Sequence, residues 1–225
     1  GDINLGAAAY SLGNDDDAVN HFKRALKIAP QAANAHFGLG LVYSDIGKFS
    51  ESSRQFARTV ELDPENHAAI QELGSAQINA KYYEKAIETG KKMQKLGLPN
   101  AYLVIGEAAL HLGNPLEAIQ YLEQASPNHS EVNALLGFCY MVQDQNDKAF
   151  TYMENALTLN PNNFGAFIAK AGIKLPGTRR LIWIQILKLV GGRHWTKPYI
   201  FHGDVFLPQG VTGNPLLSIG DPQII

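Results

Sequence analysis

A glycine that follows Leu or Ile recurs at a nearly constant interval between residues 6 and 137. The five glycines are Gly6, Gly40, Gly74, Gly106 and Gly137, so the intervals are 34, 34, 32 and 31 residues. Twelve residues after each glycine stands a small side chain: Ala18, Ser52, Ala86, Ala118 or Ala149. Sixteen residues after four of them stands a bulky apolar one: Phe22, Phe56, Leu122 or Met153. A period of this length indicates an array of repeated helix pairs.

The register of these glycines predicts close helix crossings. A glycine inside a helix costs about 1 kcal/mol relative to alanine, so five in one register need a packing reason. We expect each glycine to let the second helix of its unit approach, with the small residue as its facing partner. The bulky residue one turn later is expected to fill the space between neighbouring units. Asn14 is the predicted cap of the first of these second helices, and Pro30 its stop signal.

The pattern resembles the tetratricopeptide repeat (TPR) family. The family order of Leu-Gly, aromatic, small, bulky, small and Pro is found in two units as Leu39-Gly40, Tyr43, Ser52, Phe56, Thr59, Pro64 and as Leu136-Gly137, Tyr140, Ala149, Met153, Ala156, Pro161. The resemblance covers about residues 1–171 and implies an all-α fold, a right-handed α-solenoid of about five helix-turn-helix units. The expected units are 1–32, 33–66, 67–98, 99–129 and 130–163, followed by a partial sixth first-helix at 164–174.

The third and fourth units depart from the pattern. Gly90 and Met93 replace the expected bulky and small residues, and the two units have only 32 and 31 residues. We therefore expect a kink or a changed twist around residues 96–100.

Residues 175–225 differ in composition from the array. From Gly172 onward the sequence has no Ala and no Glu, and the tail carries a net charge of +3 against −5 for the first 175 residues. We expect a capping helix or a strand over residues 178–190, followed by irregular or short-strand structure at segments such as 199–201 and 204–207. The tail is interpreted as a cap, a truncated second domain or a non-native segment.

Composition and motifs argue against several function classes. The chain has 45% hydrophobic residues and a net charge of −2, as in ordinary soluble proteins, and the longest apolar run, 181–190, is too short to span a membrane. The acidic array argues against a nucleic-acid partner. The sequence begins at Gly1 with neither the basic nor the apolar region of a targeting peptide, so we expect that any such peptide has been removed or was never present. The compartment is left open, with the cytoplasm favoured over the bacterial periplasm.

No catalytic or metal-binding constellation is evident, so we expect no enzymatic activity, cofactor or metal. The seven histidines are scattered, and His202-Gly203-Asp204 is only part of an iron-binding facial triad because no histidine follows it. Cys139, the single cysteine, is interpreted as a packed core thiol.

In the family resembled here, the first helices line a concave groove that holds extended peptides or partner helices. Counting from each glycine predicts the groove residues Tyr10, Asn34, Phe37, Leu41, Gln71, Asn79, Leu103, Glu107, Leu110, His111, Phe138 and Met141. The first helices contain no Lys or Arg. Because a bound carboxylate needs cationic donors, we expect no binding of acidic C-terminal tails. An apolar or amphipathic partner segment fits better, with Glu107 and Asp45 able to meet its basic residues.

The predicted function is a non-enzymatic scaffold or adaptor for protein interactions. Two alternatives remain open: the array is the docking module of a larger enzyme, or the chain self-associates through stacked end units. The tail could also fold back into the groove and occupy it.

Overall fold

The computed structural model describes residues 1–173, 199–202 and 205–208. The first helices of the units are α1 (Asp2–Ser11), α3 (Ala33–Asp45), α5 (His67–Asn79), α7 (Ala101–His111) and α9 (Ser130–Val142). The second helices are α2 (Asp15–Ile28), α4 (Phe49–Leu62), α6 (Tyr83–Lys95), α8 (Pro115–Leu122) and α10 (Asn146–Leu159), and α11 (Phe164–Ile173) follows them.

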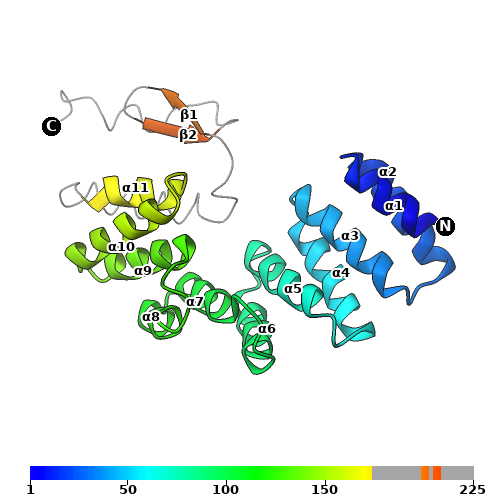
Figure 1. Ribbon diagram of the computed structural model, residues 1–225, viewed down its shortest axis with the longest axis horizontal. Coiled ribbons are helices and arrows are strands. Elements are labelled where there is room, and N and C mark those ends of the chain that lie inside the picture. Colours follow the sequence, from blue (N-terminus) through cyan, green and yellow to red (C-terminus); the bar gives the residue numbers. More distant parts are fainter. Residues whose placement is uncertain (174–198, 203–204, 209–225) are drawn as a thin grey trace.

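The helix pairs follow one another along a curved array (Figure 1), which confirms the predicted α-solenoid. Each helix packs on the next in sequence, and first helices of neighbouring units also touch, as α5 does α7 and α7 does α9. In Figure 1, α6 and α8 lie outside α5 and α7 on the bend.

In the described part of the tail, β1 (Tyr199–His202) pairs antiparallel with β2 (Val205–Pro208), in line with the short strands expected there. The helix or strand expected at 178–190 lies outside the described residues.

The repeated glycines let a bulky side chain of the second helix pack against the first helix. A Cβ added to Gly40 would lie 2.7 Å from Phe56 Cε1, and one added to Gly106 would lie 2.5 Å from Leu122 Cγ. The glycine is therefore covered mainly by the bulky residue sixteen positions on, not by the small residue that we expected as its facing partner. The small residue still contacts the same turn, since Ser52 Oγ donates a hydrogen bond to the Gly40 carbonyl at 2.9 Å.

Phe22 shows how the bulky residue also joins two units. Its ring atoms come within 3.0 Å of a Cβ built on Gly6 in its own unit, and they contact the Cβ position of Gly38 in the next unit. Phe22 is 2% exposed. A single side chain thus fills both the crossing and the space between units, as the sequence pattern predicts.

The turn inside each unit has the same backbone form. Seven residues after each repeated glycine, the chain adopts a positive φ, at Gly13, Gly47, Lys81, Gly113 and Asp144. The next amide then bonds back to the first helix, for example Lys48 N to the Tyr43 carbonyl at 2.8 Å. These are the features of a Schellman C-cap, which satisfies the last carbonyls of the first helix. Asn14 is the N-cap residue of α2, as predicted, although its side chain makes no capping hydrogen bond.

The connection between α6 and α7 differs from the two that precede it. It contains two residues with positive φ, Gly97 and Asn100, whereas the connections at 29–32 and 63–66 contain none. The departure falls at the boundary between the two shortened units, within the segment that we singled out at 96–100. A changed twist of the array at this point stays a prediction.

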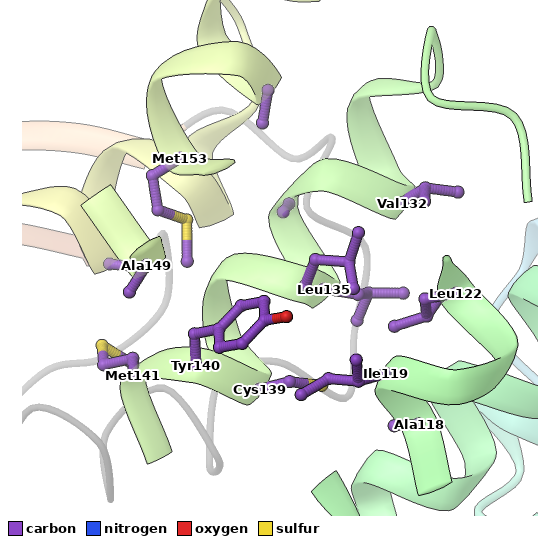
Figure 2. Close-up of a cluster of buried hydrophobic side chains, with 14 of the residues drawn as sticks. Ala118, Ile119, Leu122, Val132, Leu135, Cys139, Tyr140, Met141, Ala149 and Met153 are labelled. Carbon is purple, nitrogen blue, oxygen red and sulfur yellow. The ribbon is translucent and has the colours of Figure 1, made fainter. Parts of the chain in front are cut away.

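The largest buried cluster lies between α8, α9 and α10 (Figure 2). Cys139 lies within it with no exposed surface, and burial raises the pKa of its thiol to about 12. Because the thiolate is the reactive form, this cysteine is a packing residue, as predicted.

Candidate functional site

Each of the five first helices carries a single charged residue, and in every case it is acidic. These residues are Asp2, Asp45, Glu72, Glu107 and Glu131. Asp2 is paired, with its Oδ1 3.1 Å from His21 Nδ1 and 3.5 Å from Arg24. The other four form the set that we call the first-helix acids. Across the ranges that the structure describes, none of these four lies within 4 Å of a Lys or Arg nitrogen.

Asp45 and Glu72 form the first pair of these acids. Tyr10 Oη donates a 2.5 Å hydrogen bond to Asp45 Oδ2 across the boundary between the first two units. Burial, reinforced by Asp45, raises the pKa of Tyr10 to about 12. Burial and the negative charge of Asp45 also raise the pKa of Glu72. This end of the first-helix surface therefore holds crowded negative charge that no described cation neutralises.

Glu107 and Glu131 form the second pair, on α7 and α9. Burial raises the pKa of Glu107 to about 8, and the neighbouring charge of Glu131 adds to the shift. Burial likewise raises the pKa of Glu131. Burial and a neighbouring like charge both disfavour the ionised form of Glu107, and among the described residues no Lys or Arg nitrogen lies within 4 Å of it.

His111 contributes little positive charge to this pair. Its Nε2 lies 3.9 Å from Glu107 Oε1, and its ring stacks on Tyr83 with centroids 4.7 Å apart. Burial, together with the charge of Lys81, lowers the pKa of His111. The neutral imidazole is thereby favoured, so His111 leaves Glu107 without a strong partner.

The predicted apolar residues are mostly half-buried. Phe37 and Leu41 pack on a cluster around Phe56, where the Phe37 and Phe56 rings have centroids 5.6 Å apart. Leu103, Leu110 and Phe138 pack against the cluster of Figure 2 while keeping part of their surface open.

Met141 is the predicted groove residue that does not lie at the surface. It is 2% exposed and belongs to the same cluster as Cys139 and Met153. The position four residues after the glycine is covered here by neighbouring side chains, and Met141 has no surface left for a partner.

The predicted polar groove residues Asn34, Gln71 and Asn79 make no hydrogen bond to one another among the bonds of the described residues. Asn34 is exposed, and Gln71 and Asn79 each donate to a carbonyl one turn earlier in α5, those of His67 and Ser75. Their amides are therefore satisfied within their own helix.

Three residues of this surface escaped the sequence prediction: Glu72, Glu131 and Tyr83. Glu72 and Glu131 lie two and six positions before their glycines, outside the offsets used to define the groove. A signal for both was available, because each is the only charged residue of its helix.

Other kinds of site find no support in the residues that the structure covers. That part of the chain contains no group of three or more His, Cys, Asp or Glu arranged to hold a metal ion. None of its helices has the length and apolar character needed to cross a membrane. Gly203 and Asp204 of the partial iron motif lie outside the described residues.

Comparison with known proteins identifies the repeats. A TPR repeat model matches residues 6–47, and tetratricopeptide repeat models match residues 39–97 and 109–171. The anaphase-promoting complex subunit 3 of Schizosaccharomyces pombe is 23% identical over 165 residues, covering 68% of this chain and 25% of that protein. Hsp70-Hsp90 organizing protein 2 of Arabidopsis thaliana is 30% identical over 98 residues, covering 40% of this chain and 17% of that protein. The chain thus spans a quarter or less of the length of these curated relatives.

A similar fold is found in the solved structure of YrrB, described as a TPR protein with an unusual peptide-binding site. The two share 21% sequence identity and a TM-score of 0.61, and the match covers 76% of this chain and 90% of YrrB. At this identity the likeness concerns the fold. Because the matching models extend over residues 6–97 and 109–171, the chain belongs to the tetratricopeptide repeat family.

Proposed function

We propose that this protein is a non-enzymatic scaffold that binds a basic, amphipathic segment of a partner protein along its first helices. The observation that carries this proposal is the charge pattern: one acid on each first helix and no Lys or Arg on any of them. In the second helices, by contrast, basic residues such as Arg24, Arg54 and Lys92 are common. A surface of one sign selects and steers a partner of the opposite sign.

The first-helix acids gain from such a partner because, in the described part of the chain, none of them lies within 4 Å of a Lys or Arg nitrogen. Glu107 has a pKa near 8 and is held partly protonated by burial and by Glu131. A Lys or Arg side chain placed between them favours the ionised form and supplies the missing hydrogen-bond donor. The half-buried Leu103, Leu110 and Phe138 offer apolar contact beside these carboxylates. An amphipathic segment satisfies both kinds of contact.

The same pattern argues against an acidic ligand. Binding a carboxylate requires charge-assisted donors, whereas the donors among the predicted groove residues are amides, a hydroxyl and the His111 imidazole, whose lowered pKa favours the neutral form. We therefore propose that partners with acidic C-terminal tails are rejected, although relatives such as the organizing protein share the repeats.

Binding of designed peptides tests the proposal. The probe is a labelled amphipathic peptide of Leu and Lys, and its matched control replaces every Lys by Glu. The test variant is Glu72→Gln, Glu107→Gln, Glu131→Gln, and its control, Glu65→Gln, Glu84→Gln, Glu88→Gln, removes the same charge from exposed positions outside the first helices.

We expect the Lys peptide to bind with an affinity that falls as salt rises, and the test variant to bind it about tenfold more weakly. The control variant should bind within about twofold of the parent protein. Tighter binding of the Glu peptide, or equal losses in both variants, would contradict the proposal.

A further inference from the structure

A pocket of about 270 Å³ opens between the connection from α6 to α7 and the connection from α8 to α9. Its apolar walls include Leu98, Pro99, Leu103 and Val132. The pocket lies beside α8, which is unusually short. It has 8 residues, whereas the other second helices have 13 or 14. The chain leaves α8 at Leu122 and runs through Ala125 and His129, which line the opposite side.

The polar group that distinguishes this pocket is the imidazole of His129. Its Nδ1 atom is buried and has no hydrogen-bond partner among the described residues. A buried polar atom left without a partner costs about 1–3 kcal/mol, and this one belongs to a side chain that lines the pocket, so the His129 imidazole is the group that a polar ligand would meet there.

The backbone around His129 is held in place. Asn133, which is 4% exposed, donates from Nδ2 to the carbonyls of Pro127 at 2.7 Å and His129 at 3.0 Å. The His129 amide in turn donates to the Ser126 carbonyl at 3.3 Å. This loop is therefore fixed by a buried side chain, and a ligand meets a preformed site.

We infer that this pocket receives a tyrosine side chain of a bound partner. Its volume is below the roughly 300–1,000 Å³ of pockets that hold drug-sized ligands, which suits a single side chain. None of its lining residues is Asp, Glu, Lys or Arg, so it favours a neutral group. A phenol hydroxyl both donates and accepts, so it can pair with the His129 imidazole in either tautomer.

The pocket adjoins the surface of the proposed function through Leu103, which belongs to both. The inference rests on that function in one respect, namely that the tyrosine comes from a protein partner. The ring would occupy the space between Leu98 and Val132, and its hydroxyl would lie at His129. A tyrosine then sets the register of the segment, while the first-helix acids supply charge attraction.

The experiment uses the full chain and two small probes of similar shape, para-cresol and para-xylene, in which a methyl group replaces the hydroxyl. Binding is followed by backbone amide NMR. We expect para-cresol to shift the signals of residues 101–103 and 129–132 in a saturable way, and para-xylene to bind about fivefold more weakly because it lacks the hydroxyl. His129→Phe should remove this preference, and Ala125→Leu, which fills the pocket, should remove binding of both probes.

Absence of shifts at these residues would overturn the inference, as would equal binding of the two probes. A His129→Phe variant that keeps the full preference for para-cresol would also overturn it.

A further arm separates this inference from the proposed function. The Glu72, Glu107, Glu131 glutamine variant should bind para-cresol like the parent protein, because its substitutions lie outside the pocket lining. If the parent protein binds para-cresol but not the Lys peptide, only the groove is refuted. If it binds the Lys peptide but not para-cresol, only the pocket is refuted.

Discussion

Ile105 fills the space left by Gly90. A Cβ added to Gly90 would lie 2.5 Å from Ile105 Cγ1, and Ile105 is fully buried. Gly90 stands where other second helices carry Phe22, Phe56 or Leu122. In this unit the bulky group thus comes from the following first helix instead. The most conspicuous departure from the repeat pattern is compensated by a neighbour across the unit boundary.

This arrangement predicts opposite effects of one substitution at two buried helical glycines. Gly90→Ala should destabilise the protein by about 1–3 kcal/mol, because the added methyl group meets Ile105 in a packed interior. At Gly74 the nearest atoms to an added Cβ are 3.4 Å away, so Gly74→Ala should be neutral or stabilising by up to about 1 kcal/mol. Urea unfolding of both variants measures the difference.

The double variant Gly90→Ala, Ile105→Ala provides the control for the first effect. Removing Cγ1 of Ile105, the atom nearest to the added methyl group, makes room for it, so the double variant should lose less stability than the sum of the two single changes. Additive losses would show that the contact between residues 90 and 105 is not the cause.

The repeated turn predicts stabilisation by glycine at two positions that lack it. Lys81 has a φ of 64° and Asp144 a φ of 63°, where the equivalent residues are Gly13, Gly47 and Gly113. The left-handed conformation costs an ordinary residue about 1–2 kcal/mol, and Asp tolerates it better than Lys. Lys81→Gly should therefore raise the free energy of unfolding by about 0.5–1 kcal/mol, and Asp144→Gly by less.

Lys91→Gly is the matched control, because Lys91 is exposed inside α6. There glycine should cost about 1 kcal/mol. Destabilisation by Lys81→Gly of the same size as in Lys91→Gly would show that the turn gains nothing from glycine.

The fold could be predicted because its main constraint, the close crossing of paired helices, depends on one residue in each unit. A close crossing needs an absent side chain, and glycines at a fixed interval therefore indicate it directly. The turn glycines Gly13, Gly47 and Gly113 carry the same period and support the same division into units. The exchange between Gly90 and Ile105 could not be predicted in this way, because it depends on which of two facing helices supplies the bulky group.

The candidate site was predicted only in outline, because spacing defines a helix face but not how far a neighbouring unit covers it. Leu110 and Met141 share the same offset from their glycines, yet Leu110 keeps part of its surface while Met141 is 2% exposed. The raised pKa of Glu107 likewise depends on Glu131 from another unit. The charge pattern of the first helices does not depend on packing. It can be predicted as soon as the helices have been assigned in the sequence.

The start of α11 depends on one buried amide. Asn163 is 5% exposed, accepts a 3.0 Å hydrogen bond from Ala166 N and donates a 2.9 Å bond to Ser130 Oγ. Asn163→Ala removes both and should lower the free energy of unfolding by about 1–2 kcal/mol. Hydrogen exchange should accelerate first at the amide of Ala166. Asn162→Ala, at an exposed neighbouring position, is the control and should leave exchange in α11 unchanged.

Glu107 predicts a stability that depends on pH in a specific direction. Its pKa is about 8 in the folded chain and 4.5 as an ordinary carboxyl, so the folded state binds the proton more tightly. The stability contributed by the protonated form is complete below about pH 4.5 and is lost as the pH rises toward 8, at up to about 1.4 kcal/mol per pH unit.

Glu107→Gln mimics the protonated form and should remove this loss. The stability of the variant relative to the parent protein should therefore increase from pH 5 to pH 8, as measured by urea unfolding at several pH values. Comparing the two proteins at each pH cancels the titrations that they share. The charged and titratable groups around residue 107 are Glu131, His111 and Lys81, and their own titration responds to the loss of the Glu107 charge. Glu88→Gln, which makes the same substitution at an exposed position of α6, is the matched control. If the difference between Glu107→Gln and the parent protein is constant, Glu107 is ionised throughout this pH range. Glu107 would then no longer support the proposal that the first-helix acids bind a basic partner.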